Sequence, residues 1–241
     1  LYVSGGLALT RQQGLQVKLD DVGATPRTVN ALEFGAGSVD LFAGTSPSPY
    51  FADTNGDGTI DEADTRPAGA TGLVLENVDF GFMLMRPTTA SSIKYFALKA
   101  TASFAGLVGI DDFKLSASGI TVEYNSLKNP NDPTDTAVVD FKASFPATGG
   151  LPLDLGNGTL KFDFDNKRLL VSIAEADLQI STYVFVHGSL AFEKADDVSV
   201  FVGTDPLPTK MSATNIGAQN LTMFVGANGP YWTDIDGSND I

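Results

Sequence analysis

Apolar side chains recur in this sequence as pairs two residues apart, and each pair is followed, after a five-residue step, by further apolar residues. The recurrences are Leu32/Phe34 with Val39/Leu41, Leu73/Leu75 with Phe80/Phe82, Phe113/Leu115 with Ile120/Val122, Val171/Ile173 with Leu178/Ile180, and Ile216 with Leu221/Met223. A period of two is typical of a strand with one buried face. No segment shows sustained helical periodicity, and Val, Ile, Thr and Phe occur throughout, so the sequence predicts an all-β fold.

The five-residue step reverses the side-chain alternation, so the chain must bend, bulge or turn within the four residues between the pairs. These residues are mostly small or polar: GAGS, ENVD, SASG, AEAD and GAQN. If each step is a corner, the fold is an elongated β-solenoid. If each step is a hairpin loop, the fold is a set of stacked antiparallel β-sandwich modules. We favour the solenoid, because a spacing of about 40 residues recurs along the chain, with one longer interval that holds an insertion, Asn129–Thr136.

A longer repeat covers the whole chain. Residues 25–44 align without a gap on residues 207–226, so that Phe224 follows Phe42 by 182 residues. The sequence therefore predicts one full repeat unit, 1–182, and about the first third of the next unit, 183–241. The first residues have neither an initiator Met nor the charged start of a signal peptide, so we expect a piece of a longer chain.

An acidic stretch, DTNGDGTIDEAD from Asp53 to Asp64, has the spacing of a twelve-residue calcium loop. Its predicted ligands for Ca²⁺ are the side chains of Asp53, Asn55, Asp57, Asp61 and Asp64 and the backbone carbonyl of Thr59. Gly58 stands where such a loop turns sharply. Position 12 is Asp rather than the usual Glu, which is closer to dockerin-type loops than to a helical calcium-binding hand. The alternative is a solvated turn rich in Asp, Asn and Gly.

The second unit contains a degenerate copy of this loop. Asp234, Asp236 and Asp240 follow the same Pro-Tyr-aromatic lead, but Ser238 replaces Asp57 and Asn239 replaces Gly58. We expect little or no metal there.

Composition excludes several classes of function. The net charge of −14 disfavours nucleic acids and anionic membranes as partners. The chain has no Cys, so it has no thiolate metal site and no cysteine nucleophile. Its single His, His187, is expected to be a strand histidine that faces solvent, so we expect no catalytic triad and no zinc site. No apolar run is long enough to span a membrane as a helix. Adjacent carboxylates such as Asp111 and Asp112 would point to opposite faces of a strand, so we expect no enzyme activity.

Several stretches are similar to the repeats of giant bacterial surface exoproteins, of the LEPR-XLL or haemolysin-type calcium-binding class. They are Gly72–Met85, Tyr95–Asn125, Val184–Lys194 and Ile216–Gly229. The resemblance implies export, a very long parent chain and a surface, adhesion or filament role, and it transfers no catalytic residues. The glycine-rich GGxGxD motif of the toxin repeats is absent.

The sequence thus predicts an extracellular structural repeat module, rigidified by calcium, of an adhesin stalk or surface filament. Its partners would be neighbouring repeats or identical subunits joined head to tail, with residues 1–60 in the environment of 183–241. The alternative is a carbohydrate-binding module in which Tyr231 and Trp232 stack on surface glycans. We expect the equivalent pair, Tyr50 and Phe51, to pack the acidic loop against the core. The insertion carries Asp132 and Asp135, which we interpret as a solvated loop rather than a second ion site.

Overall fold

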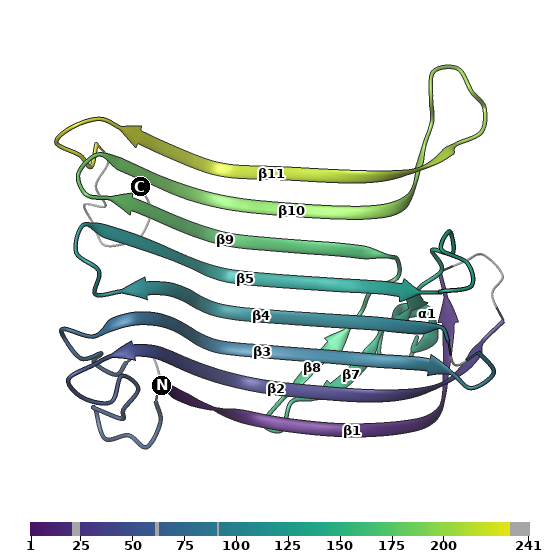
Figure 1. Cartoon of the computed structure of the whole chain (residues 1–241), viewed down its shortest axis with the longest axis horizontal. Helices are drawn as coiled ribbons and strands as arrows, with labels where there is room; N and C mark the ends of the chain where they lie inside the picture. Colours follow the sequence, from purple (N-terminus) through teal and green to yellow (C-terminus); the bar gives the residue numbers. More distant parts are fainter. Residues whose placement is uncertain (21–24, 61–62, 91, 232–241) are drawn as a thin grey trace.

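The computed structural model describes residues 1–20, 25–60, 63–90 and 92–231 of the chain. Within these residues, nine strands form one antiparallel sheet in the order β11-β10-β9-β5-β4-β3-β2-β1-β6 (Figure 1). Apart from β6, each strand pairs with the next sheet strand along the chain, so the sheet is a meander.

The long strands are β1 (Tyr2–Leu19), β2 (Arg27–Thr45), β3 (Thr71–Pro87), β4 (Lys94–Val108), β5 (Phe113–Lys128), β9 (Arg168–Ile180), β10 (Val184–Val200) and β11 (Thr209–Val225). Between β5 and β9 lie four short elements, β6 (Val139–Asp140), α1 (Phe141–Ser144), β7 (Leu151–Asp154) and β8 (Thr159–Phe162). We call residues 129–167 the insert.

The all-β prediction is confirmed, whereas the solenoid prediction is wrong. Corners at the four-residue steps would have wound the chain into coils. Instead, each long strand continues through its step as one strand, and the chain reverses direction only at the strand's end. The same observation contradicts the alternative, in which the steps are hairpin loops between sandwich modules.

The steps are irregularities inside continuous strands. Ser38, Asn77, Gly119 and Asn220 each lie in a step and have positive φ angles of 47°, 49°, 57° and 53°. In the remaining step, β9 places two residues against one residue of β10, because the pairing shifts between Gly188 and Leu190. A bulge adds one residue and thereby returns the apolar pairs on its two sides to the same face of the sheet.

The insert packs on one face of the sheet, which we call the insert face. Strands β3 and β4 contribute Met83, Met85, Tyr95 and Ala97 to the core, all fully buried. The insert contributes three buried aromatic residues that contact one another, namely Phe141, Phe162 and Phe164. In Figure 1, β7 and β8 lie behind the lower strands of the sheet. The predicted insertion at 129–136 is therefore only the beginning of a segment that supplies six of the fourteen buried residues of this core.

Glycines let the insert approach the sheet closely. A Cβ atom at Gly35 would overlap the carbonyl oxygen of Asp154, and one at Gly37 would overlap Oδ1 of Asn157. The side chain of Asn157 also donates a hydrogen bond to the carbonyl of Gly37 (Nδ2 to O, 2.9 Å). The loop between β7 and β8 is thus seated directly on the backbone of β2.

An ion-pair network also joins the insert to the sheet. Lys99 Nζ on β4 lies 2.9 Å from Asp163 Oδ1 in the insert and 3.2 Å from Glu123 Oε1 on β5. Burial lowers the pKa of Lys99, but the hydrogen bond and charge of Asp163, together with Glu123, raise it by more. The lysine is therefore held in its charged form beneath the insert.

The other face of the sheet, which we call the open face, carries the apolar pairs found in the sequence. Across β5, β9 and β10 they align in rows, with Ile120 beside Ile173 and Ile173 beside Leu190. Leu32, Leu115 and Leu190 are each 44–45% exposed. The core of the described structure accordingly lies on the insert face.

Candidate functional site

The acidic loop predicted to bind calcium connects β2 to β3 and is anchored by aromatic side chains. Tyr50 and Phe51 are 7% and 3% exposed. Tyr50 stacks on Phe42 of β2 with ring centroids 4.3 Å apart, and the guanidinium of Arg66 lies 4.8 Å from the centroid of Phe51. The expected packing role of this pair is observed, and it holds both ends of the loop against the sheet.

Carboxylates in the loop bind backbone N–H groups of the loop itself. Gly56 N–H donates to Asp53 Oδ1 (2.6 Å) and Gly58 N–H to Asp53 Oδ2 (2.9 Å). Thr59 donates to Asp57 Oδ1 from both its N–H (2.8 Å) and its hydroxyl (2.6 Å). The side-chain hydrogen bond from Thr59, followed by the backbone one, lowers the pKa of Asp57. The acid therefore stays ionised at neutral pH, as a metal ligand must.

The last predicted ligand closes the loop onto its beginning. Asp64 is 6% exposed, and its Oδ1 accepts hydrogen bonds from the N–H of Thr54 (2.6 Å) and from that of Asn55 (3.3 Å). Asn55 in turn contacts Asp57 through its side-chain amide (Nδ2 to Oδ2, 3.1 Å). Four of the five predicted side-chain ligands thus belong to one hydrogen-bonded turn.

The donors in this loop are carboxylate and amide oxygens, which are the ligands that a hard cation such as Ca²⁺ takes. Asp61, the other predicted side-chain ligand, lies outside the described residues. Among the described residues, Asp53, Asp57 and Asp64 are not a group of three whose oxygens converge within 4.8 Å. Calcium binding at this loop therefore stays a prediction, supported by the chemistry of the donors.

A pocket of about 400 Å³ separates the loop from the bulged part of the sheet. Its lining comes from the loop and from three strands: Ile60, Ala63, Arg66, Ser38, Asp40, Glu76, Asn77 and Ser103. Arg66 forms an ion pair with Glu76 across it (3.5 Å). The loop is thus attached at its aromatic anchors and by this ion pair.

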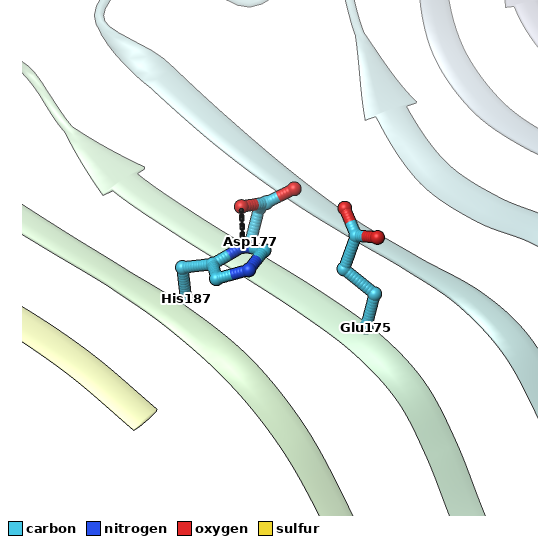
Figure 2. Close-up of side chains that lie close together, drawn as sticks. All are labelled: Glu175, Asp177 and His187. Atoms are coloured by element: carbon cyan, nitrogen blue, oxygen red, sulfur yellow. Dashed lines mark hydrogen bonds and ion pairs between the residues drawn. The ribbon is translucent and has the colours of Figure 1, made fainter. Parts of the chain in front are cut away.

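A second cluster of ligand-type side chains lies on β9 and β10 (Figure 2). The nearest ligand atoms of Glu175, Asp177 and His187 all lie within 4.8 Å of one another. The strand register places Asp177 directly opposite His187, and His187 Nδ1 is 2.9 Å from Asp177 Oδ1. An imidazole with two carboxylates is a donor set that suits a transition metal.

A lysine of the neighbouring strand already neutralises part of the charge of this cluster. Lys114 Nζ on β5 lies 3.3 Å from Asp177 Oδ2, on the side away from His187. Burial raises the pKa of Asp177, but the hydrogen bond from His187 and the charge of Lys114 lower it by more, so the net pKa is below its ordinary value. The described contacts are those of an ion-paired cluster between three strands.

Sequence reasoning missed Glu175 and Asp177, because they lie in the step AEAD. The expectation of a solvent-facing His187 is also wrong, since its side chain is 19% exposed and pairs with Asp177. The signal was present: β9 and β10 are joined by a short turn after Ile180, and counting back from it places Asp177 opposite His187. The strands could not be joined in this way while the step was interpreted as a corner.

The remaining predicted residues do not form a site with these groups. Asp132 accepts hydrogen bonds from Thr134, and Asp135 accepts one from Asn129 (2.9 Å), which is the turn structure of a polar loop. Tyr231 is 74% exposed and stacks on Phe224 with centroids 6.3 Å apart. The residues predicted beside it lie outside the described part of the chain, namely Trp232, Asp234, Asp236 and Asp240.

The described residues contain no helix of the length and hydropathy that a membrane crossing requires. No protein-family model, no curated protein and no solved structure matches this chain. The similarity to giant surface exoproteins accordingly stays a prediction from the sequence.

Proposed function

We propose that this chain is a structural repeat module of an exported bacterial surface protein, in which the sheet of one unit continues into the sheet of the next. The observation that carries the proposal is that the β10–β11 hairpin has the same pairing as the β1–β2 hairpin. Tyr2 pairs with Phe42, and Phe185 pairs with Phe224 in the same way. The first strand of the second hairpin, β10, follows β1 by 183 residues, and its second strand, β11, follows β2 by 182 residues.

Both irregularities of the first hairpin recur in the second. The pairing of β1 with β2 shifts between Ser4 and Gly6, and that of β10 with β11 shifts between His187 and Ser189. A second shift follows Gln12 in β1 and Ala195 in β10. Two bulges at matching positions specify the register far more tightly than alternation alone. This match supports a sheet built from a repeated unit.

In such a sheet one unit would contribute six long strands, β1 to β5 and β9, and the next unit would begin at β10. Antiparallel strands lie about 4.8 Å apart, so each unit would lengthen the sheet by about 29 Å across the strands. The meander needs no crossover between units, because β9 and β10 are joined by a short turn. An extended ribbon of this kind suits a stalk or surface filament.

Calcium at the Asp53–Asp64 loop would rigidify the edge of each unit, and millimolar calcium is an extracellular condition. The proposal therefore places the protein outside the cell. Its nearest partners would be further copies of the unit, before and after it.

The test is a chain of two units, residues 1–183 followed directly by residues 1–241, so that Leu1 takes the place of Val184 after the β9–β10 turn. It is studied by small-angle X-ray scattering. A continuous sheet predicts scattering from one rigid body that is about 29 Å wider across its strands than the single chain, and one cooperative unfolding transition. A matched chain with a flexible Gly-Ser linker between the units should instead scatter as two independent bodies. If the two chains scatter alike and unfold in two steps, the proposal is wrong.

A carbohydrate-binding module remains the second prediction from the sequence, but no observation favours it. The first copy of its aromatic pair, Tyr50 and Phe51, is buried and packs the acidic loop. A glycan array in millimolar calcium separates the two functions, since a structural module should bind none of the sugars.

A further inference from the structure

The outer side of β1 is an edge of the sheet (Figure 1). On that side β1 pairs with β6 at Lys18 and Leu19, and no other described strand pairs with it there. The edge runs from Tyr2 to Val17. The N–H and C=O groups along such an edge form a template for another strand.

The internal repeat shows which strand fits this template. β10 is the counterpart of β1, and its outer side is fully paired with β9, from Val184 opposite Ile180 to Ala195 opposite Arg168. The edge that is unpaired in β1 is therefore paired in β10. The strand that pairs with it there is β9, whose sequence and register are known.

Side-chain exposure follows the same pattern. Leu7 and Leu9 of β1 are 69% and 71% exposed. Their counterparts in β10, Leu190 and Phe192, are 44% and 36% exposed. In β10 these residues lie beside Ile173 and Val171 of β9. β1 thus keeps apolar side chains at the positions where β10 contacts its neighbour, although it has no such neighbour among the described residues.

We propose that the outer edge of β1 binds the β9 segment, Arg168–Ile180, of another copy of the repeat unit, an inference that rests on the proposed function. The incoming strand would run antiparallel to β1, with Ser172 opposite Ala8 and Leu170 opposite Thr10. This register sets Ile173 and Val171 beside the exposed leucines and brings apolar side chains together on the open face.

Charges do not oppose this pairing. In the chain itself, Arg168 of β9 pairs with Glu193 of β10 (3.1 Å) and Asp177 pairs with His187 (2.9 Å). The positions in β1 that correspond to Glu193 and His187 are Thr10 and Ser4, which are uncharged. The β9 segment would lose one ion pair and one hydrogen bond, and at these two positions neither Arg168 nor Asp177 belongs to a pair of like charges.

Disulfide trapping tests both the partner and the register, because the chain has no cysteine of its own. The probe is a synthetic peptide of residues 167–182, since β9 of an intact chain is already held between β5 and β10. We expect the full chain with Ala8→Cys to trap a Ser172→Cys peptide and the chain with Thr10→Cys to trap a Leu170→Cys peptide. Cysteines form a disulfide when their Cα atoms lie about 4.4–6.8 Å apart.

The crossed combinations, Ala8→Cys with Leu170→Cys and Thr10→Cys with Ser172→Cys, are the register controls and should trap several-fold less peptide. Asn215→Cys, on the opposite edge strand β11, is the control for position and should trap little. Equal trapping in the crossed pairs or at β11 would overturn the inference. So would an absence of trapping at Ala8→Cys and Thr10→Cys.

A second measurement uses charge to block the edge. The double substitution Leu7→Lys and Leu9→Lys should weaken binding of a fluorescent peptide by about tenfold, because two cross-strand apolar pairs are lost and charged side chains block edge pairing. Leu221→Lys on β11 is the matched control and should leave the affinity unchanged. Equal affinity for all three proteins would contradict the inference.

The two proposals fail separately. If the two-unit chain forms one extended sheet but the peptide is not trapped, β1 does not bind a β9 segment from a separate molecule. The inference of binding between separate copies is then wrong, and the proposed function, which joins the units within one chain, stands. If the peptide is trapped in register but the two-unit chain scatters as separate bodies, the proposed function is wrong and the edge remains a strand-binding site.

Discussion

The β1–β2 and β10–β11 hairpins have the same register and the same two bulges, yet their surroundings differ. The first hairpin lies under the insert and the acidic loop, whereas described residues leave most of the second exposed. A Cβ atom at Gly35 would overlap the carbonyl of Asp154, but one at its counterpart Gly217 would meet no described atom within 4 Å. Strand pairing is therefore set by the local sequence, and burial is set by segments that come from elsewhere.

The largest expected difference between the two hairpins is at a phenylalanine that they share. Phe42 is 4% exposed and stacks on Tyr50, while its counterpart Phe224 is only half-buried. Phe42→Ala should lower the free energy of unfolding by about 3–5 kcal/mol, and Phe224→Ala by about 1–2 kcal/mol. Urea unfolding of the two variants measures both values. Equal losses would show that the two hairpins are covered to the same extent.

The glycines beneath the insert offer a second matched pair. Gly35→Ala should destabilise the protein by about 1–3 kcal/mol, because its methyl group would overlap Asp154 and force the insert outwards. Gly217→Ala should be close to neutral, since its methyl group would enter open space. Neither residue has a positive φ angle, so backbone strain does not contribute to the difference. A Gly217→Ala variant as unstable as Gly35→Ala would contradict this account of the insert.

Calcium should distinguish the two copies of the acidic loop. If Asp53–Asp64 is the site, calcium at ten times its Kd should raise the free energy of unfolding by about 1.4 kcal/mol. Asp57→Ala should abolish that increase, whereas Asp236→Ala in the degenerate copy should leave it intact. Calorimetry supplies the Kd. An absence of heat in millimolar calcium, or an equal loss in both variants, would rule out the first loop as the site.

The sequence was sufficient to predict the strands and the irregular steps within them, but not the way the steps are used. A reversal of alternation at GAGS or SASG is produced equally by a corner, a loop or a bulge. A bulge can be recognised only when the strands that pair on both sides are known, and the sequence of a single strand does not identify those partners. Local patterns therefore predicted the apolar pairs and misassigned the architecture.

The core was missed for a related reason. Three of its aromatic residues, Phe141, Phe162 and Phe164, belong to the insert, in which Phe162 and Phe164 alternate with polar residues but lack the five-residue step that marks the long strands. The unusual length of the interval between Leu115 and Ile173 was the available signal, and only the polar residues 129–136 were assigned to it. In the candidate site, the acidic loop has a local signature, whereas Asp177 and His187 are brought together by pairing between strands.

Small effects are expected at the two partners of Asp177, which are Lys114 and His187, the counterpart of Ser4 in the first hairpin. His187→Ser removes the hydrogen bond to Asp177 and should lower the free energy of unfolding by about 1 kcal/mol at neutral pH. Asp177 has a lowered pKa in the folded protein, so its contribution to stability is full above the ordinary Asp pKa of about 3.9. That contribution is lost as the pH falls through the lower, folded-state value. The difference in the free energy of unfolding between wild type and His187→Ser should therefore shrink below about pH 4. Unfolding curves recorded at several pH values measure it.

The substitution Lys114→Met removes the more exposed partner of Asp177 and should have a smaller effect on the free energy of unfolding at neutral pH. A difference that is constant down to low pH would show that His187 stabilises β10 by packing and not through the carboxylate.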